Sequence, residues 1–223
     1  MKITHIASGS KANAFTIERE HDTIQIDAGK MGEADTLLIT HVHGDHFKYF
    51  NRMVANGMKW WAPEPVMEQI IDNSVNPSGL IEQYQKPNGV EAFGLYHDQP
   101  CFGYIIRDGE ESYCHITDTG QVDIEDYLKG HTVYSIESNY DPDALWSTSR
   151  PDWLKERIEN THLSNAQAID IAEDLATENT KVVQFIHMSE HATSRAITEM
   201  EHALSKLNRK YDVGIIYDTE EKE

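Results

Sequence analysis

Residues 36–46 read TLLITHVHGDH, an apolar run followed at once by three histidines and one aspartate. The apolar run is typical of a buried strand, so we expect the polar residues after it on a loop and on the first turn of a helix. Imidazole nitrogens and carboxylate oxygens are ligands for zinc and similar divalent ions. A fixed H-x-H-x-D-H pattern after a strand is more restrictive than a histidine-rich surface tract, which is the alternative. A two-metal hydrolase is therefore the leading hypothesis, with the candidate ligands His41, His43, Asp45 and His46.

The chain is strongly acidic, with 19 Lys and Arg residues against 38 Asp and Glu residues and a formal net charge of −19. A field of that sign repels polyanions at a distance, which argues against broad electrostatic binding of nucleic acid. Divalent ions and a local group of Lys and Arg can still reverse the sign inside one cleft, so a phosphodiester substrate is not excluded. The composition favours small or end-bound substrates.

The length of 223 residues fits one domain, and no repeat, linker or low-complexity block divides the sequence. We expect a single domain over 1–223, with a frayed acidic tail at 218–223. The sequence has no apolar run of membrane-spanning length and does not start with a secretory signal pattern. We therefore expect a soluble protein of the cytoplasm with no membrane partner.

Short strand-like runs crowd the first half of the chain, and helical segments follow in the second half. Ser164 and Gln167 match a capping box, and the apolar residues after them form one stripe that should pack on a sheet. Strands buried from both sides with helices outside predict an α/β fold, a four-layer αββα sandwich whose loops share a site at one edge. The expected strands are 3–7, 14–17, 23–26, 36–39, 59–61, 90–96, 102–107, 112–116, 132–136, 182–186 and 213–217. The expected helices are 65–73, 151–160, 164–177 and 194–206.

Two metal ions about 3.5 to 4 Å apart need more ligands than the histidine motif supplies. Other parts of the chain must therefore contribute, and residues at the ends of expected strands are the natural sources. These candidates are Asp27, His97, Asp118 and His187.

For three of these candidates the sequence leaves an alternative open. His115 and His131 compete with His97 as the third histidine ligand. Asp118 could merely cap the turn that follows it, a role that Asp often fills. His187 could be a hydrogen-bonded histidine of the core.

The order of the motifs, an Asp, H-x-H-x-D-H, a His, an Asp and a final His, resembles the metallo-β-lactamase-fold superfamily. Within it the sequence is most similar to the WalJ/YycJ-type, nuclease-like proteins, and more distantly to the tRNA 3′-end endonuclease. The resemblance covers nearly the whole chain and departs at Tyr140, at Thr161 and at the pair Lys11-Ala12. The matching segments are 7–10 (ASGS), 97–98 (HD), 117–120 (TDTG), 137–139 (ESN), 153–158 (WLKERI), 162–165 (HLSN) and 187–189 (HMS).

The resemblance implies two divalent metal ions per chain, with zinc first and manganese as the alternative. Asp118 would bridge the ions, and Asp27 would accept a hydrogen bond that orients a metal-site histidine or water. The ligands of one ion would be His41, His43 and His97. The ligands of the other ion would be Asp45, His46 and His187.

The same resemblance implies a hydrolase of phosphodiester bonds in nucleic acid, a nuclease that is exonuclease-like on DNA. Glu137 and His162 would form the couple that protonates the departing oxygen, unless they make only a structural hydrogen bond. His162 lies just before the helix that starts near Ser164, where unpaired amides suit an anionic substrate. The catalytic residues would be Glu137, His162 and Asp45, and Asn139 and Ser164 would contact the substrate. Lys11 is a further candidate contact for a phosphate, because the loop between the first two expected strands should overhang the metals.

Cationic and aromatic residues gather between positions 146 and 157. They could grip phosphates and stack bases, as such residues do in single-strand sites. They could equally be an ordinary solvated helix face with two core aromatics. They are Trp146, Arg150, Trp153, Lys155 and Arg157.

Two other functions are compatible with the sequence. A phosphodiesterase of small cyclic nucleotides or signalling dinucleotides keeps the chemistry and suits a chain without an inserted arm. A non-catalytic member of the fold would bind a nucleotide without turning it over. The expected partners are therefore nucleic acid or a small nucleotide, and a homodimer is one of the oligomeric states considered.

Overall fold

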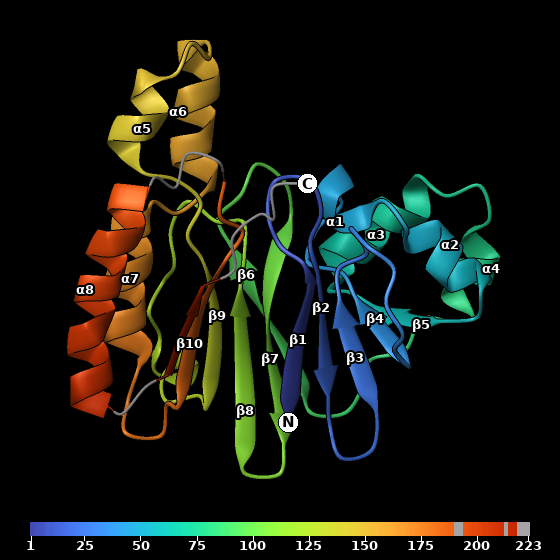
Figure 1. Cartoon of the computed structure of the whole chain (residues 1–223). Coiled ribbons are helices and arrows are strands. Elements are labelled where there is room, and N and C mark those ends of the chain that lie inside the picture. The colour runs from blue at the N-terminus through green and yellow to red at the C-terminus, as the bar shows by residue number, and fades with distance from the viewer. Residues whose placement is uncertain (190–193, 212–213, 218–223) are drawn as a thin grey trace.

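Two β-sheets lie face to face at the centre of the molecule, and helices cover the outer face of each sheet (Figure 1). The computed structural model describes residues 1–189, 194–211 and 214–217. The α/β sandwich of four layers that the sequence predicts is confirmed.

The first sheet comes from the N-terminal part of the chain and has the order β1-β2-β3-β4-β5. β1, β2 and β3 are antiparallel, whereas β4 and β5 run parallel to β3. The strands are β1 (Lys2–Ala7), β2 (Ala14–Glu18), β3 (Thr23–Ile26), β4 (Thr36–Leu38) and β5 (Lys59–Trp61). The accompanying helices are α1 (Gly44–Phe47), α2 (Phe50–Ala55), α3 (Glu64–Asp72) and α4 (Pro77–Ile81).

The second sheet has the order β11-β10-β9-β8-β7-β6. Its strands from β8 to β11 are parallel, and β7 and β6 complete it in antiparallel fashion. The strands are β6 (Val90–Leu95), β7 (Cys101–Asp108), β8 (Glu111–Ile116), β9 (Val133–Glu137), β10 (Val182–Ile186) and β11 (Gly214–Tyr217). The helical segments are the 3₁₀ turn η1 (Asp126–Leu128), α5 (Pro142–Ser147), α6 (Asp152–Thr161), α7 (Asn165–Leu175) and α8 (Ser194–Tyr211).

The short strand β4 shows why the layers form. Successive side chains of a strand point to opposite faces of its sheet. Leu38 packs between the two sheets against Ile26 and Tyr104, whereas Leu37 packs outward against Phe50 and the other residues under α2 and α3. Both leucines are fully buried. A strand that is apolar on both faces must be covered on both, which requires a second sheet on one side and helices on the other.

The ends of β3, β4, β6, β8, β9 and β10 meet at one edge of the sandwich, at the top in Figure 1. Asp27 follows β3 directly and His187 follows β10 directly, and both have left-handed backbone, with φ of 62° and 56°. Such a conformation costs a non-glycine residue about 1 kcal/mol or more, so surrounding contacts must hold it. The backbone N–H of Asp27 donates to the Leu38 carbonyl at 2.8 Å, and that of His187 donates to the Ser8 hydroxyl at 2.8 Å. Both backbones therefore turn sharply where the strands end.

All eleven expected strands occur, and each end lies within one residue of the expected position. The sequence does not predict α2, α4 and α5, because helices of five or six residues are too short to show a helical period. α8 also runs to Tyr211, beyond the expected end at 206. The expected acidic tail at 218–223 lies outside the described residues. No helix within those residues has the length and apolar character needed to cross a membrane.

Candidate metal centre

Three histidines from two separate loops form the first group of donor atoms. The Nε2 atoms of His41 and His97 each lie 3.1 Å from Nδ1 of His43. Nitrogens about 2.0–2.1 Å from one zinc in tetrahedral arrangement lie roughly 3.3 Å apart, so this spacing is that of a shared ion. His41 and His43 follow β4, while His97 follows β6 in the other sheet.

A second group of donors lies next to the first. Nε2 of His46 is 3.3 Å from an Asp45 oxygen and 3.2 Å from an Asp118 oxygen. Nε2 of His187 is 3.4 Å from the same Asp45 oxygen and 3.5 Å from the same Asp118 oxygen. These separations again suit ligands around one divalent ion.

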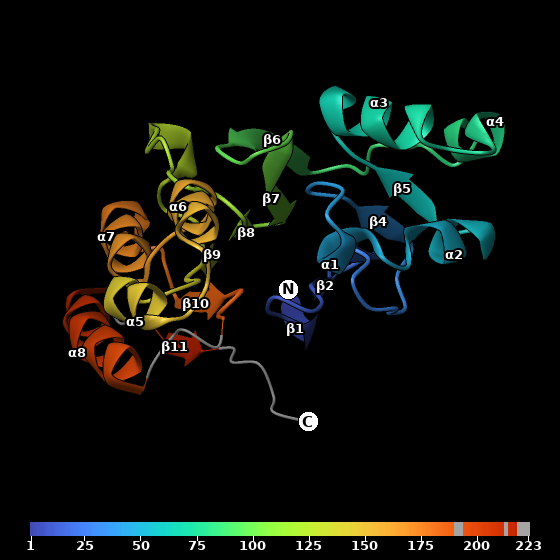
Figure 2. The same ribbon diagram turned by 90° about the horizontal axis from the view of Figure 1, so that it is seen from above.

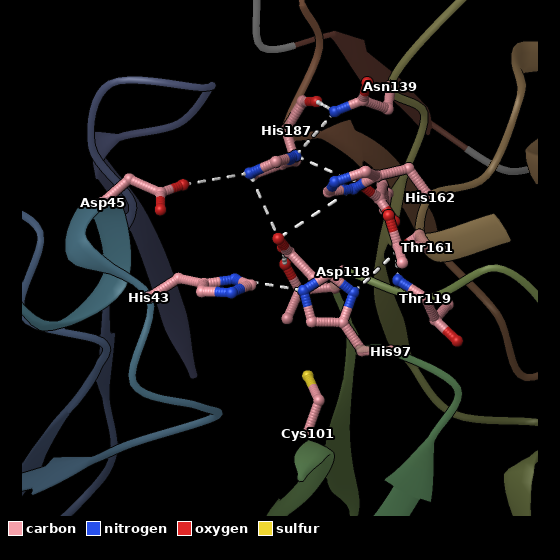
Figure 3. Close-up of polar contacts among 12 residues, drawn as sticks. His43, Asp45, His97, Cys101, Asp118, Thr119, Asn139, Thr161, His162 and His187 are labelled. Atoms are coloured by element: carbon pink, nitrogen blue, oxygen red, sulfur yellow. Dashed lines mark hydrogen bonds and ion pairs between the residues drawn. The ribbon is translucent and has the colours of Figure 1, made fainter. Parts of the chain in front are cut away.

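Asp118 belongs to both groups, as Figure 3 shows for His97, His187 and Asp45 around it. Its Oδ1 faces His46 and His187, whereas its Oδ2 lies 3.7 Å from Nε2 of His41. One carboxylate with an oxygen toward each group has the geometry of a bridging ligand. The seven side chains that the resemblance implies as ligands are therefore brought together, and their chemistry fits two divalent ions.

Each histidine has a partner on the nitrogen that faces away from the shared space. Nδ1 of His46 lies 2.7 Å from Oδ2 of Asp27, and the other oxygen of Asp27, Oδ1, accepts from the Thr40 backbone N–H at 2.9 Å. Nδ1 of His97 donates to the Thr161 carbonyl at 3.0 Å (Figure 3). A proton held on the outer nitrogen leaves the inner nitrogen as a lone-pair donor for a metal. The contact expected between Asp27 and a histidine of the site thus occurs with His46.

Asp98 is a further partner, and the sequence assigns it no role. Its Oδ1 is 3.4 Å from Nε2 of His43, and its Oδ2 accepts from Nε of Arg157 at 2.8 Å. Asn13 is another buried partner, since its Nδ2 donates to Asp45 at 3.1 Å. Only the segment 97–98 of the family resemblance could have drawn attention to Asp98, and Asn13 carries no signal of its own.

The buried charges shift the histidines in opposite directions. Burial lowers the pKa of His41 well below its ordinary value, and His46 lowers it further. Burial would also lower the pKa of His46, but Asp118 and then Asp27 outweigh it and hold that pKa well above its ordinary value. In the same way Asp118, followed by Asp45 and Glu137, overcomes burial and raises the pKa of His187 to about 10. A cation that binds the second group must displace these protons.

Glu137 and His162 form a close pair beside these groups. Nδ1 of His162 is 2.5 Å from Oε1 of Glu137, whose other oxygen accepts from the Thr119 backbone N–H at 2.9 Å. Glu137 is fully buried, and its Oε1 is also 3.1 Å from Nδ1 of His187. The pair expected from the sequence is therefore present and touches the second donor group.

Residues 18–188 match the family model described as a beta-lactamase superfamily domain, which covers most of the chain. The chain belongs to the beta-lactamase superfamily. Two relatives are 27% identical to it: exodeoxyribonuclease YycJ of Bacillus anthracis, over 97% of this chain and 94% of that protein, and exodeoxyribonuclease WalJ of Streptococcus pneumoniae, over 98% and 94%. Among solved structures, zinc-bound PqqB of Methylobacterium extorquens has a TM-score of 0.68 at 12% identity, with 97% of each chain covered. The expected family is confirmed, and the chain is a hydrolase of this superfamily.

A pocket of about 340 Å³ opens beside the two donor groups. Asn139 lines it and donates from Nδ2 to the His187 carbonyl at 3.1 Å. The structure does not bring Lys11 or Ser164 into the lining, among the residues that it describes. Lys11 is exposed on the loop after β1, and the Ser164 hydroxyl is engaged with Gln167 in the cap of α7. We therefore carry only Asn139 forward as a substrate contact.

Proposed function

We propose that this superfamily member is a dinuclear metal-dependent phosphodiesterase that cleaves nucleic acid and acts on DNA as an exonuclease. The observation that carries the proposal is the buried Glu137–His162 pair next to two donor groups that share Asp118. The name exodeoxyribonuclease, borne by two relatives that match nearly the whole chain, supports DNA as the substrate.

The residues of the chain account for orientation and proton transfer. Two divalent ions, when bound, would act as Lewis acids that activate water and offset the negative charge of a phosphoryl group. Burial would raise the pKa of Glu137, but His162 lowers it and keeps the carboxylate ionised. Glu137 accepts a hydrogen bond from Nδ1–H of His162, which leaves Nε2 to face a substrate in the pocket that His162 lines. A proton on Nε2 then passes to the departing alkoxide, and the ring keeps its Nδ1 proton, hydrogen-bonded to Glu137; such general-acid catalysis contributes roughly 10²- to 10⁴-fold.

Asp45 has a second task in this proposal besides ligation. It lines the pocket at the boundary between the second donor group and the open space. Its pKa is lowered, because the hydrogen bonds of His187 and His46 outweigh the effect of burial. An ionised Asp45 attracts a cation to the reacting end of the pocket, and without that cation its negative charge would repel the anionic substrate.

The size of the pocket favours a second candidate, hydrolysis of a small cyclic nucleotide or signalling dinucleotide. About 340 Å³ lies at the lower end of the range for small-molecule sites, roughly 300–1,000 Å³. The net charge of −19 also disfavours long polyanions outside the pocket. If the substrate is DNA, a pocket of this volume admits only the end of a DNA strand.

An activity panel separates these functions. Linear and circular single-stranded DNA, RNA, cyclic mononucleotides and cyclic dinucleotides are each incubated with zinc- or manganese-loaded protein. Linear DNA should be degraded while the circular form persists, and Asp45→Ala, purified identically, should remove the activity. Cleavage of cyclic nucleotides alone would favour the second candidate. Protein that carries two ions and cleaves nothing would instead be a non-catalytic nucleotide binder.

A further inference from the structure

The pocket beside the metal groups has two unlike walls. One wall consists of charged donors such as Asp45, Asp118 and His187. The opposite wall comes from α6 and the residues just before it, and includes the apolar side chains of Leu154 and Ile158. Residues four apart lie one above the other on the same face of a helix. α6 therefore presents an apolar strip, Leu154 with Ile158, to the pocket.

Among the cationic and aromatic residues of this region, Arg150 and Arg157 line the pocket, whereas Trp146 and Lys155 make contacts within the arm formed by α5 and α6. Trp146 donates from its indole N–H to Glu159 at 2.7 Å, and the Lys155 ammonium lies 5.1 Å from the Trp146 ring centre. Trp153 is 66% exposed and does not line the pocket. Arg157 lines the pocket but is paired with Asp98. Besides Arg157, what α6 adds to the pocket is thus the apolar strip.

The arm is also fixed relative to the metal groups. α5 and α6 rise beyond the sheet edge at which the strands end, and from above α6 lies across the site from α1 (Figures 1 and 2). The Thr161 carbonyl at the end of α6 accepts from His97, and Arg157 in its middle holds Asp98 beside His43. These contacts therefore fix the position of the apolar strip relative to a phosphate bound at the two donor groups.

We propose that the Leu154–Ile158 strip is a nucleoside subsite, which packs against the nucleoside whose phosphate lies at the metal groups. This inference rests on the proposed function, since it places a phosphate of the same ligand there. A nucleotide has one strongly anionic end and one flat, largely apolar part, and the two walls match these two parts. Ile158 is 8% exposed and packs with Leu145 and Tyr140, so the more exposed Leu154 offers most of the free apolar surface, which a purely polar phosphate ester would leave uncovered. The strip thus selects nucleotides from among phosphate esters.

Binding of two monoesters to the zinc-loaded full chain tests the subsite independently of turnover. Thymidine 5′-monophosphate and methyl phosphate carry the same anionic group, and only the first has a nucleoside. Calorimetric titration should give a dissociation constant at least about tenfold lower for the thymidine ester. Leu154→Ala should reduce this ratio by roughly five- to tenfold, because the half-buried side chain loses its contact with the nucleoside. Leu154→Met, of similar volume, should restore most of it.

The matched control is Trp153→Ala, which removes a larger exposed side chain from the adjacent position of the same helix. Its ratio should equal that of the wild type. Equal affinities for the two monoesters in the wild type, or an unchanged ratio in Leu154→Ala, would overturn the subsite. Wild-type protein that hydrolyses DNA but shows no nucleoside preference contradicts only the subsite. A preserved ratio without any hydrolysis contradicts only the proposed function.

Discussion

The two sheets contribute to the candidate centre in different ways. The first sheet supplies its donors from one stretch, 41–46, directly after β4. The second sheet supplies its donors one at a time, from the ends of strands that are far apart in the sequence: His97, Asp118, Glu137 and His187. The first set is therefore specified locally, whereas the second set exists only when the second sheet is folded. Asp118 is the point at which the two sets meet.

Removal of Asp118 should have the largest effect, because it deprives both donor groups of a ligand at once. We expect Asp118→Ala to lose at least one of the two ions and to lower hydrolysis by more than about 10³-fold. Metal analysis after gel filtration, with circular dichroism to verify folding, measures this. Glu125→Ala changes an exposed carboxylate of the same region and should match the wild type. Full metal content in Asp118→Ala would contradict the claim that Asp118 is a ligand shared by the two donor groups.

His162→Ala tests whether the second sheet contributes chemistry beyond metal ligation. We expect both ions to be retained and the turnover number to fall by roughly 10²- to 10⁴-fold, because the proton donor is lost. Exposed His21→Ala is the control for loss of a histidine. Turnover equal to that of the wild type would reduce the Glu137–His162 contact to a structural hydrogen bond.

The partners of the outer nitrogens allow a finer comparison. Asp27 is fully buried and contacts both His46 and Thr40, whereas Asp98 is partly exposed and lies 3.4 Å from His43. Asp27→Asn should weaken zinc binding by about 10- to 100-fold, and Asp98→Asn should stay near the lower limit of that range. Competition with a chromophoric chelator gives both affinities. Asp98 is held by Arg157 of α6. If Asp98→Asn lost more zinc affinity than Asp27→Asn, the donors of 41–46 would depend more on this contact with α6 than on Asp27.

The pH dependence of metal binding should differ between the two donor groups. His46 and His187 have raised pKa values, with that of His187 at about 10, so they hold protons at neutral pH that a cation must displace. Affinity at the second group should therefore rise with pH, by about tenfold per pH unit for each proton displaced. His41 and His97 have lowered pKa values, so the first group should respond little above pH 6.5. Zinc titrations between pH 6.5 and 8.5 measure both, and equal slopes would contradict the difference.

The sequence predicts the local part of the site well, for a physical reason. The H-x-H-x-D-H stretch is short, and a strand before it fixes its context, so the pattern itself carries the information. Asp118 and His187 could be proposed because they lie at the ends of expected strands, and the order of motifs, which resembles a family, then assigned each of them a place at the ions. Their side chains converge because of the order of the strands in the folded sheet, and the spacing of residues along the chain does not indicate that order.

The contacts made by α6 illustrate what the sequence does not disclose. Arg157 and Asp98 are 59 positions apart, and His97 and Thr161 are 64 apart. The sequence predicts α6, which carries the apolar strip, as a helix over 151–160, but α5 is six residues long and gives no periodic signal, so the pairing of the two helices into an arm is not foreseen. The sequence draws attention to Lys11 through the expected position of its loop above the metals, whereas the pocket is lined by Leu154 and not by Lys11. Of the expected substrate contacts, Asn139 lines the pocket, whereas Lys11 and Ser164 do not.

Anomalous diffraction from crystals of the zinc-loaded protein tests the central claim most directly, since it locates the ions without any assay. We expect two zinc peaks about 3.5 to 4 Å apart. One should be bounded by His41, His43 and His97, the other by Asp45, His46 and His187, with an oxygen of Asp118 at each. A single peak, or zinc bound with Asp118 and His187 turned away from it, would contradict the two-metal centre.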